Sequence, residues 1–259
     1  MISSYSSYVA IGDSFTEGVG DERPDGGVRG WADLVAIGLA YASSSSVTYA
    51  NLAVRGRLLA PIIAGQLDAA IALQPALLSI NGGGNDILRP RVSIVSIADQ
   101  LHAAVDRAVA GGSHVLLVSG GNPTKHLPFG PLFHARGEEL AAEVHRRLPK
   151  ADVTFVDNWA DPDLLDARFW SGDKLHLNSR GHERVASNVL AALGLSIPDA
   201  AAGPHLGIPA QRTAAYWRQY VLPWIGRRLT GRSSGDGRGP KIATLQHVSL
   251  PPGLAGQQQ

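Results

Sequence analysis

Short apolar runs alternate with longer segments of helical periodicity along most of this 259-residue chain. The first run, Tyr-Val-Ala-Ile at residues 8–11, contains β-branched side chains and stops at Gly12, which is typical of a buried strand that ends at a tight turn. The alternation predicts βαβ units, and hence a three-layer α/β/α sandwich around a central, mostly parallel five-stranded sheet of flavodoxin-like type. Strands are expected near residues 7–12, 47–51, 76–81, 114–119 and 152–157, and helices over residues 31–41, 58–73, 94–110, 133–148 and 179–193.

Charge divides the chain into two parts. From Gln211 onward, seven Lys or Arg residues stand against one Asp, although basic and acidic residues are nearly balanced over the whole chain. A chain of this length can bury a single core. We therefore expect one domain over residues 1–200, followed by a basic C-terminal extension over residues 201–259.

The extension contains one segment with helical spacing. Residues 211–229 combine arginines with Tyr216, Tyr220 and Trp224 at four-residue intervals, which indicates an amphipathic helix. Two interpretations stay open: the helix packs its aromatic stripe on the acidic domain, which we favour, or it makes a peripheral contact with an anionic membrane surface. Residues 231–259 are rich in Gly, Ser, Pro and Gln, which predicts an irregular tail.

A serine follows the first predicted strand. Ser14 lies just beyond the carboxyl end of that strand, where ligands bind in open parallel sheets, although its hydroxyl could instead cap the next segment. A serine hydroxyl is a weak nucleophile at neutral pH and needs a neutral imidazole to take its proton. Among the nine histidines, His176 is preferred because Asp173 precedes it by three residues in a predicted loop and could orient its ring. His182 is the main competitor; we expect it to make a structural contact, although an exchange of roles stays open.

Four sequence blocks carry a resemblance to a known family. The first reads GDSFTEG at residues 12–18, the second contains Gly56, the third is GGGND with Asn85, and the last is DKLH at residues 173–176. In this order and spacing they resemble the SGNH hydrolases, also called GDSL-type esterases and lipases, over roughly residues 8–193. The resemblance implies the same three-layer fold and a serine-dependent hydrolysis that needs no cofactor.

Three donors are candidates for an oxyanion hole. They are the backbone N–H groups of Ser14 and Gly56 and the side-chain amide of Asn85, because a glycine lets the main chain approach a substrate closely and an Asn offers an N–H donor. Asp13 and Asp86 flank these positions, and we expect their carboxylates to accept backbone hydrogen bonds that stiffen the loops.

These residues predict a carboxylic ester hydrolase that acts through an acyl-enzyme on Ser14, with a small-molecule or lipid ester as substrate. Two alternatives stay open. One is an acyltransferase that uses the same site to acylate a sugar or metabolite hydroxyl, and the other is a non-catalytic, membrane-associated binding module on the same scaffold. The sequence leaves the acyl chain length, the alcohol and the oligomeric state open.

Composition excludes several other classes of site. The chain has no cysteine, so neither a disulfide nor a thiolate metal site is expected. HExxH, EF-hand and phosphate-loop motifs are missing, so we expect no metal and no cofactor, and we expect no nucleic-acid partner. The first twenty residues hold neither Lys nor Arg nor a seven-residue apolar run, which argues against a secretory signal, and no apolar stretch reaches eighteen residues. The composition therefore predicts a cytoplasmic enzyme.

Overall fold

The computed structural model describes residues 5–43, 45–89, 91–127, 130–148, 151–196, 233–251 and 254. The strands are β1 (Ser7–Ile11), β2 (Thr48–Asn51), β3 (Leu77–Ile80), β4 (His114–Val118), β5 (Val153–Val156) and β6 (Ile242–His247). The helices are α1 (Ser14–Glu17), α2 (Trp31–Ala42), α3 (Leu59–Ile62), α4 (Asp68–Ala72), α5 (Gly84–Ile87), α6 (Ile94–Ala110), α7 (Gly130–Arg147) and α8 (Ser179–Ala192). A π-helical turn, Ile63–Leu67, joins α3 to α4, and two short 3₁₀ helices, Asp163–Leu165 and Ala167–Phe169, precede α8.

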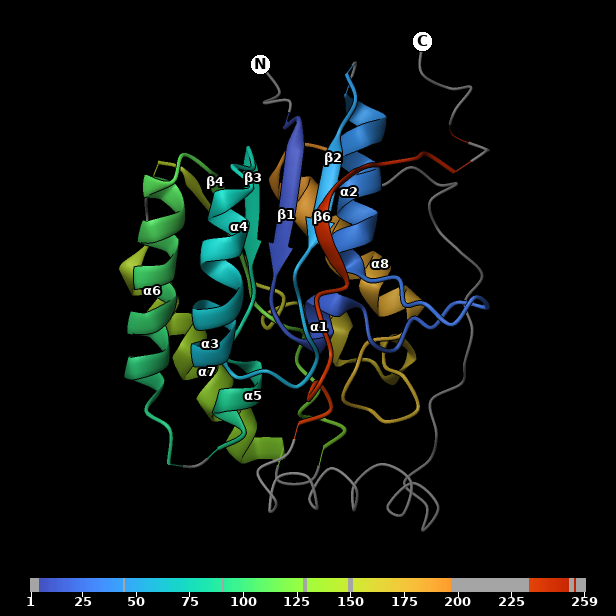
Figure 1. Ribbon diagram of the computed structural model, residues 1–259. Coiled ribbons are helices and arrows are strands. Elements are labelled where there is room, and N and C mark those ends of the chain that lie inside the picture. The colour runs from blue at the N-terminus through green and yellow to red at the C-terminus, as the bar shows by residue number, and fades with distance from the viewer. Residues whose placement is uncertain are drawn as a thin grey trace.

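The strands form one sheet in the order β5-β4-β3-β1-β2-β6. The first five strands of this order pair in parallel, and β6 pairs antiparallel with β2. All five parallel strands therefore end at the same edge of the sheet. Figure 1 shows β1 and β3 pointing toward the edge where α1 and α5 lie. The segments that leave the sheet at this edge carry most of the candidate site.

Helices cover both faces of the sheet, which confirms the predicted three-layer architecture. In β1, Tyr8 and Ala10 face one core, together with the apolar residues of α2 and α8. Val9 and Ile11 face the other core, which they share with α3, α4, α6 and α7. This alternation of side chains along a strand that is buried on both faces explains why the run has no polar residue in it.

Each of the five predicted strands is present, with bounds shifted by at most one residue at either end. The prediction of five strands is nevertheless wrong, because residues 242–247, expected to belong to an irregular tail, form the sixth. In β6 only Ile242 and Leu245 are even partly buried, and the other four side chains are exposed. An exposed edge strand lacks the apolar alternation by which a strand is recognised, so its pairing with β2 was not visible in the sequence.

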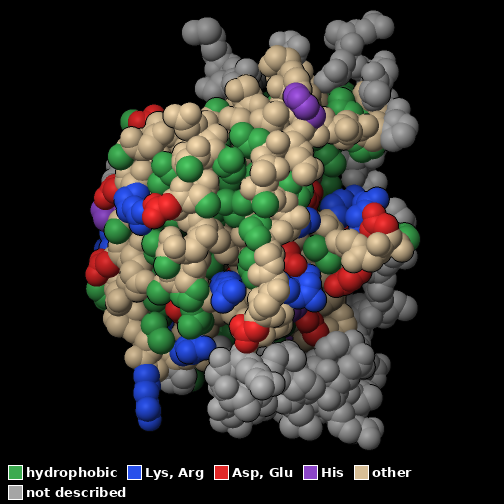
Figure 2. All heavy atoms as spheres, viewed as in Figure 1, with side chains coloured by type: hydrophobic (Ala, Val, Ile, Leu, Met, Phe, Trp, Pro, Cys, Tyr) green, Lys and Arg blue, Asp and Glu red, His purple; other side chains and the backbone are tan. Residues whose placement is uncertain are grey.

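The predicted helix over residues 211–229 lies outside the described residues, so its two interpretations stay predictions, as does the domain boundary near residue 200. Within the described ranges, no helix has both the length and the apolar character needed to cross a bilayer. On the face shown in Figure 2, basic and acidic side chains of the described residues are interspersed among hydrophobic ones.

Candidate active site

Ser14 is the first residue of α1, directly after β1 and the dipeptide Gly12-Asp13. Asp13, not Ser14, caps this helix: its Oδ1 accepts a hydrogen bond from Phe15 N at 3.0 Å. Because Asp13 satisfies the helix terminus, the Ser14 hydroxyl is available for another partner. The capping role considered for Ser14 therefore does not hold.

The Ser14 hydroxyl meets the predicted histidine. Ser14 Oγ lies 3.0 Å from His176 Nε2, although the two residues are 162 positions apart in the chain. His176 Nδ1 lies 2.5 Å from Asp173 Oδ2. In the tautomer with its proton on Nδ1, the ring donates to the carboxylate and accepts the serine proton, which is the geometry needed to generate a serine nucleophile.

The loop that carries Asp173 and His176 is held by its own hydrogen bonds. Asp173 Oδ1 accepts from Ser171 Oγ at 2.7 Å, Leu175 N at 2.9 Å and His176 N at 2.9 Å. The backbone closes a turn through Ser171 N to His176 O at 2.8 Å, with Lys174 at a positive φ of 59°. The carboxylate that faces the imidazole is therefore fixed on its other oxygen by three donors.

Two contacts hold this loop against the segment that follows α1. A Cβ added to Gly20 would lie 2.0 Å from Leu177 O and 3.2 Å from His176 Cβ, and Gly20 has a φ of 101°. Ser179 Oγ donates to Asp21 Oδ1 at 2.6 Å. A side chain at position 20 would push the histidine loop away from the serine, so this close approach requires glycine.

Charge and burial shift the pKa values of the three carboxyl and imidazole groups around Ser14. Burial alone would raise the pKa of Asp173, but the charge of His176 and the hydrogen bonds to the carboxylate outweigh it and hold that pKa well below its usual range. Burial alone would lower the pKa of His176, but the charges of Asp173 and Asp13 and the hydrogen bond to Asp173 raise it overall. Burial raises the pKa of Asp13 to about 6. At neutral pH both carboxylates are therefore ionised and favour a positive charge on the imidazole.

Asn85 reaches the same place from α5, the short helix that follows β3. Its side-chain Nδ2 donates to Asp13 Oδ2 at 3.0 Å and to Arg57 O at 3.0 Å. Asp86 Oδ2 accepts a hydrogen bond from Leu59 N at 3.0 Å, at the first residue of α3. Asn85 is thus oriented by two acceptors, and both of its amide hydrogens already have partners.

Gly56 lies on the loop after β2, with a positive φ of 74°. Its backbone is covered by the C-terminal segment: a Cβ added there would lie 2.3 Å from Ser233 Oγ and 2.9 Å from Ser234 Oγ. Among the described residues that line the cavity at Ser14, Asn85 and His176 are present and Gly56 is not. Its role as an oxyanion donor stays a prediction.

His182 makes structural contacts, as expected. It is fully buried, its Nδ1 accepts from Trp31 N at 3.2 Å, and its Nε2 donates to Val19 O at 3.2 Å. Burial lowers the pKa of His182 to about 4, so the ring is neutral at physiological pH. Both ring nitrogens are occupied, and the ring does not compete with His176 for Ser14.

One buried positioning residue was missed by the sequence analysis. Gln66, in the π-helical turn, accepts from Gly12 N at 2.8 Å and donates to Gly12 O at 3.0 Å. The Gln66 amide therefore fixes both backbone polar groups of Gly12, the residue directly before Asp13 and Ser14. The available signal was a polar residue on the buried side of the predicted helix over residues 58–73, where an apolar residue is expected.

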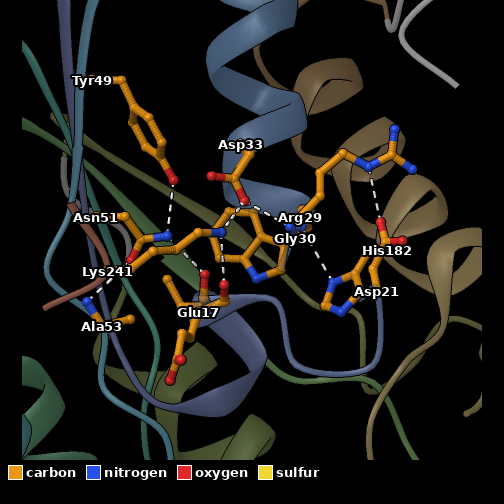
Figure 3. A network of polar contacts seen from close by, with 12 residues as sticks. Glu17, Asp21, Arg29, Gly30, Asp33, Tyr49, Asn51, Ala53, His182 and Lys241 are labelled. Atoms are coloured by element: carbon orange, nitrogen blue, oxygen red, sulfur yellow. Dashed lines mark hydrogen bonds and ion pairs between the residues drawn. The ribbon is translucent and has the colours of Figure 1, made fainter. Parts of the chain in front are cut away.

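A second missed group lies at the other end of α1. Glu17 accepts from Arg55 N at 2.7 Å and pairs with the Arg55 guanidinium, directly before Gly56. The Glu17 carbonyl accepts from Lys241 Nζ at 2.8 Å, and Lys241 also pairs with Asp33 at the start of α2 at 2.6 Å. Figure 3 shows Lys241 between Asp33 and the end of α1. The C-terminal segment is therefore tied to the helix that begins with Ser14.

A cavity of about 140 Å³ is lined by Ser14, Asn85 and His176. Apolar side chains from β4, β5, α6 and α7 line it as well, among them Leu101, Leu117, Phe133, Leu140, Val144 and Phe155. Many of these belong to the core between the sheet and the α6–α7 layer. The described residues contain no group of three or more side chains placed to hold a metal ion.

Comparisons with known proteins identify the family and show related folds. The sequence model of the GDSL-like lipase/acylhydrolase family matches residues 10–184. The fold is similar to that of the lipase Lip_vut3 from a goat rumen metagenome, at 18% identity and a TM-score of 0.62 over 72% of this chain and 96% of that one. It is also similar to the acetylxylan esterase Axe2 from Geobacillus stearothermophilus (21% identity, TM-score 0.57, 74% and 96% covered) and to TesA (24% identity, TM-score 0.56, 72% and 97% covered). No curated protein matches the sequence.

Proposed function

The chain belongs to the GDSL-like lipase/acylhydrolase family, and on this premise we propose that it hydrolyses carboxylic esters through a covalent acyl-enzyme on Ser14. The observation that carries the proposal is the unbroken series from Asp173 through His176 to Ser14, with heavy-atom distances of 2.5 and 3.0 Å. The 3.0 Å between Ser14 Oγ and His176 Nε2 is within the range over which a general base takes a proton, and the contact of His176 Nδ1 with Asp173 orients the ring for this step. The series ends in a cavity of the molecule, where a substrate has access to the hydroxyl.

In the proposed mechanism, Ser14 Oγ attacks the acyl carbon while His176 Nε2 takes the hydroxyl proton. Asp173 keeps the ring in the required tautomer and stabilises the imidazolium. His176 then protonates the departing alcohol, which leaves the acyl group on Ser14. A water molecule releases the acid by the same steps, with His176 again as the base.

Stabilisation of the tetrahedral oxyanion is assigned to Ser14 N–H, Gly56 N–H and the Asn85 amide. The Asn85 amide is held by Asp13 and by Arg57 O, so one of its N–H groups must turn from its present acceptor, or be shared with it, when the oxyanion forms. Because the amide is already held at the cavity that Ser14 lines, this change of acceptor replaces a larger movement of the side chain.

The first test is covalent labelling. A small fluorophosphonate should phosphonylate Ser14, and mass spectrometry of the digested protein should find the adduct there and not on Ser119, which lines the same cavity. Ser14→Ala should remove both labelling and the hydrolysis of p-nitrophenyl esters. An adduct elsewhere, or hydrolysis that survives in Ser14→Ala, contradicts the proposal.

The second test is the pH profile. His176 must be neutral to act as a base, and its pKa is raised above the ordinary value of 6.5. Activity should therefore fall as the pH drops through that raised pKa, with the midpoint of kcat/KM above pH 6.5. A flat profile between pH 5 and 8 argues against His176 as the base.

A further inference from the structure

We propose that the cavity beside Ser14 binds the acyl chain of the ester, and that it selects an unbranched hydrocarbon chain of about six carbons. The inference rests on the proposed function, because it needs an acyl group attached to Ser14. It specifies what that function leaves open, namely the chemical class and the length of the acyl group.

The lining of the cavity fits a hydrocarbon and not a sugar. Among the described lining residues, Asp13 is the one carboxylate, and no Lys or Arg side chain takes part. The two hydroxyls of the lining that lie away from the triad are already used: Ser119 Oγ donates to Asp157 and Thr124 Oγ1 donates to Asn122. A polyol in this mostly apolar cavity would find few partners for the hydrogen bonds that it gives up to water, whereas a hydrocarbon gains from burial.

The order of the proposed reaction assigns the cavity to the acid part of the ester. The alcohol leaves first and must reach solvent while the acyl group is still attached to Ser14. An alcohol bound deep among the side chains of α6 and α7 would have to escape past the acyl group, whereas an acyl chain stays bound until water releases it. The cavity between sheet and helices is therefore suited to the acyl chain.

The size of the cavity limits the chain. A volume of about 140 Å³ is close to that of an engineered apolar cavity that takes up benzene, a molecule of six carbons. Each buried methylene should raise kcat/KM roughly four-fold until the cavity is full. The four additional methylenes of a hexanoate should thus favour it over an acetate by on the order of 100-fold.

Helix α7 offers a matched pair of positions for the test. Its wall toward the cavity includes Phe133, Gly137, Leu140, Ala141 and Val144, at helical spacing. A Cβ at Gly137 would lie 2.0 Å from Trp159 Cζ2, so this position cannot be enlarged without damage. Ala141 lines the cavity and is half-buried, whereas its neighbour Ala142 is exposed.

The experiment measures kcat/KM on p-nitrophenyl esters from acetate to dodecanoate, with wild type, Ala141→Leu and Ala142→Leu. Wild type should show its maximum near hexanoate. Ala141→Leu fills the space of two to three methylenes, so the ratio of its kcat/KM on hexanoate to that on acetate should fall by roughly 20- to 60-fold. Ala142→Leu should follow wild type. If Ala141→Leu does not fold, Leu140→Ala, which enlarges the cavity, should move the maximum to longer chains.

Three outcomes overturn the inference. A wild-type profile that is flat or highest on acetate removes the chain-length selection. An equal loss on acetate and hexanoate in Ala141→Leu, or an unmoved maximum in Leu140→Ala, removes the cavity as its cause. Fluorophosphonate labelling of Ser14 separates these failures from failure of the proposed function: Ser14-dependent hydrolysis with any of these profiles overturns the acyl-chain assignment alone, whereas an unlabelled, inactive wild type overturns both.

Discussion

Replacement of Asp173 by Asn tests whether this carboxylate sets the tautomer of His176. In the structure, Asp173 Oδ1 accepts from Ser171 Oγ, Leu175 N and His176 N, and Oδ2 faces His176 Nδ1. An Asn at this position will keep its carbonyl oxygen toward the three donors. Its NH₂ group then points at His176 Nδ1, which must accept, so the ring proton moves to Nε2 and faces Ser14.

The size of the expected fall in kcat depends on how strongly the new Asn side chain is held in one orientation. Turning the Asn over would place its NH₂ group against three donors, at about 1 kcal/mol for each lost hydrogen bond, or roughly 3 kcal/mol in all. The turned-over form is then populated at about the 1% level, because each 1.4 kcal/mol is a factor of ten. The shortage of the correct tautomer alone should lower kcat about 100-fold, and loss of the charge that stabilises the imidazolium should bring the total fall to about 10⁴-fold, as expected when the acid of such a triad becomes an amide.

The assay is kcat/KM on a p-nitrophenyl ester at pH 8, together with the rate at which a fluorophosphonate labels Ser14. Asp25→Asn is the matched control, because Asp25 is an exposed carboxylate that likewise accepts a backbone hydrogen bond, from Gly27 N. Both rates should collapse in Asp173→Asn and stay unchanged in the control. A folded Asp173→Asn enzyme that keeps more than a tenth of the wild-type kcat/KM would refute the role assigned to Asp173.

Three further variants test other parts of the site. Asn85→Ala should lower kcat by about 100- to 1000-fold with a smaller change in KM, and an unchanged kcat removes Asn85 from the oxyanion hole. Burial lowers the pKa of His182 to about 4, so between pH 6.5 and 4 this ring is protonated in the unfolded chain and neutral in the folded chain. The fall in pH therefore favours unfolding of wild type. His182→Gln has no titrating ring, so its free energy of unfolding should fall by about 3 kcal/mol less than that of wild type between pH 7 and pH 4. Urea unfolding at each pH measures this difference. Lys241→Met removes the donor shared by the Glu17 carbonyl and Asp33 and should lower the free energy of unfolding by about 1 to 3 kcal/mol; no measurable change means that the contact does not stabilise the fold.

The elements that could be predicted from the sequence are those whose own residues determine them. The strand of residues 8–11 is buried on both faces, and its apolar run is visible without knowledge of its neighbours. Helix α6 was predicted with its observed bounds, because its apolar residues repeat at helical spacing. The segment over residues 58–73 is helical as expected, but a π-helical turn interrupts it, and the apolar periodicity of the segment did not indicate that turn.

In the candidate site, the sequence indicated the residues and the structure supplied their partners. The pairing of Asp173 with His176 spans only three residues, so it could be predicted from their spacing within one expected loop. The contact of Gln66 with Gly12 spans 54 residues and depends on how α3 and α4 pack against one face of β1. Hydrogen bonds of this kind depend on tertiary packing, so they could not be predicted from a single sequence.

The C-terminal segment has the strongest dependence on tertiary structure. The family match ends at residue 184, and the sequence predicted a separate basic extension after residue 200. Yet β6 pairs with β2, Lys241 donates to the last carbonyl of α1, and Ser233 lies against Gly56. The helix that begins with Ser14 and the glycine assigned to the oxyanion hole are thus both supported by residues beyond the family match. Because α1 has only four residues and cannot be stable alone, its position depends on such supports, among them the contacts made by residues 233–247.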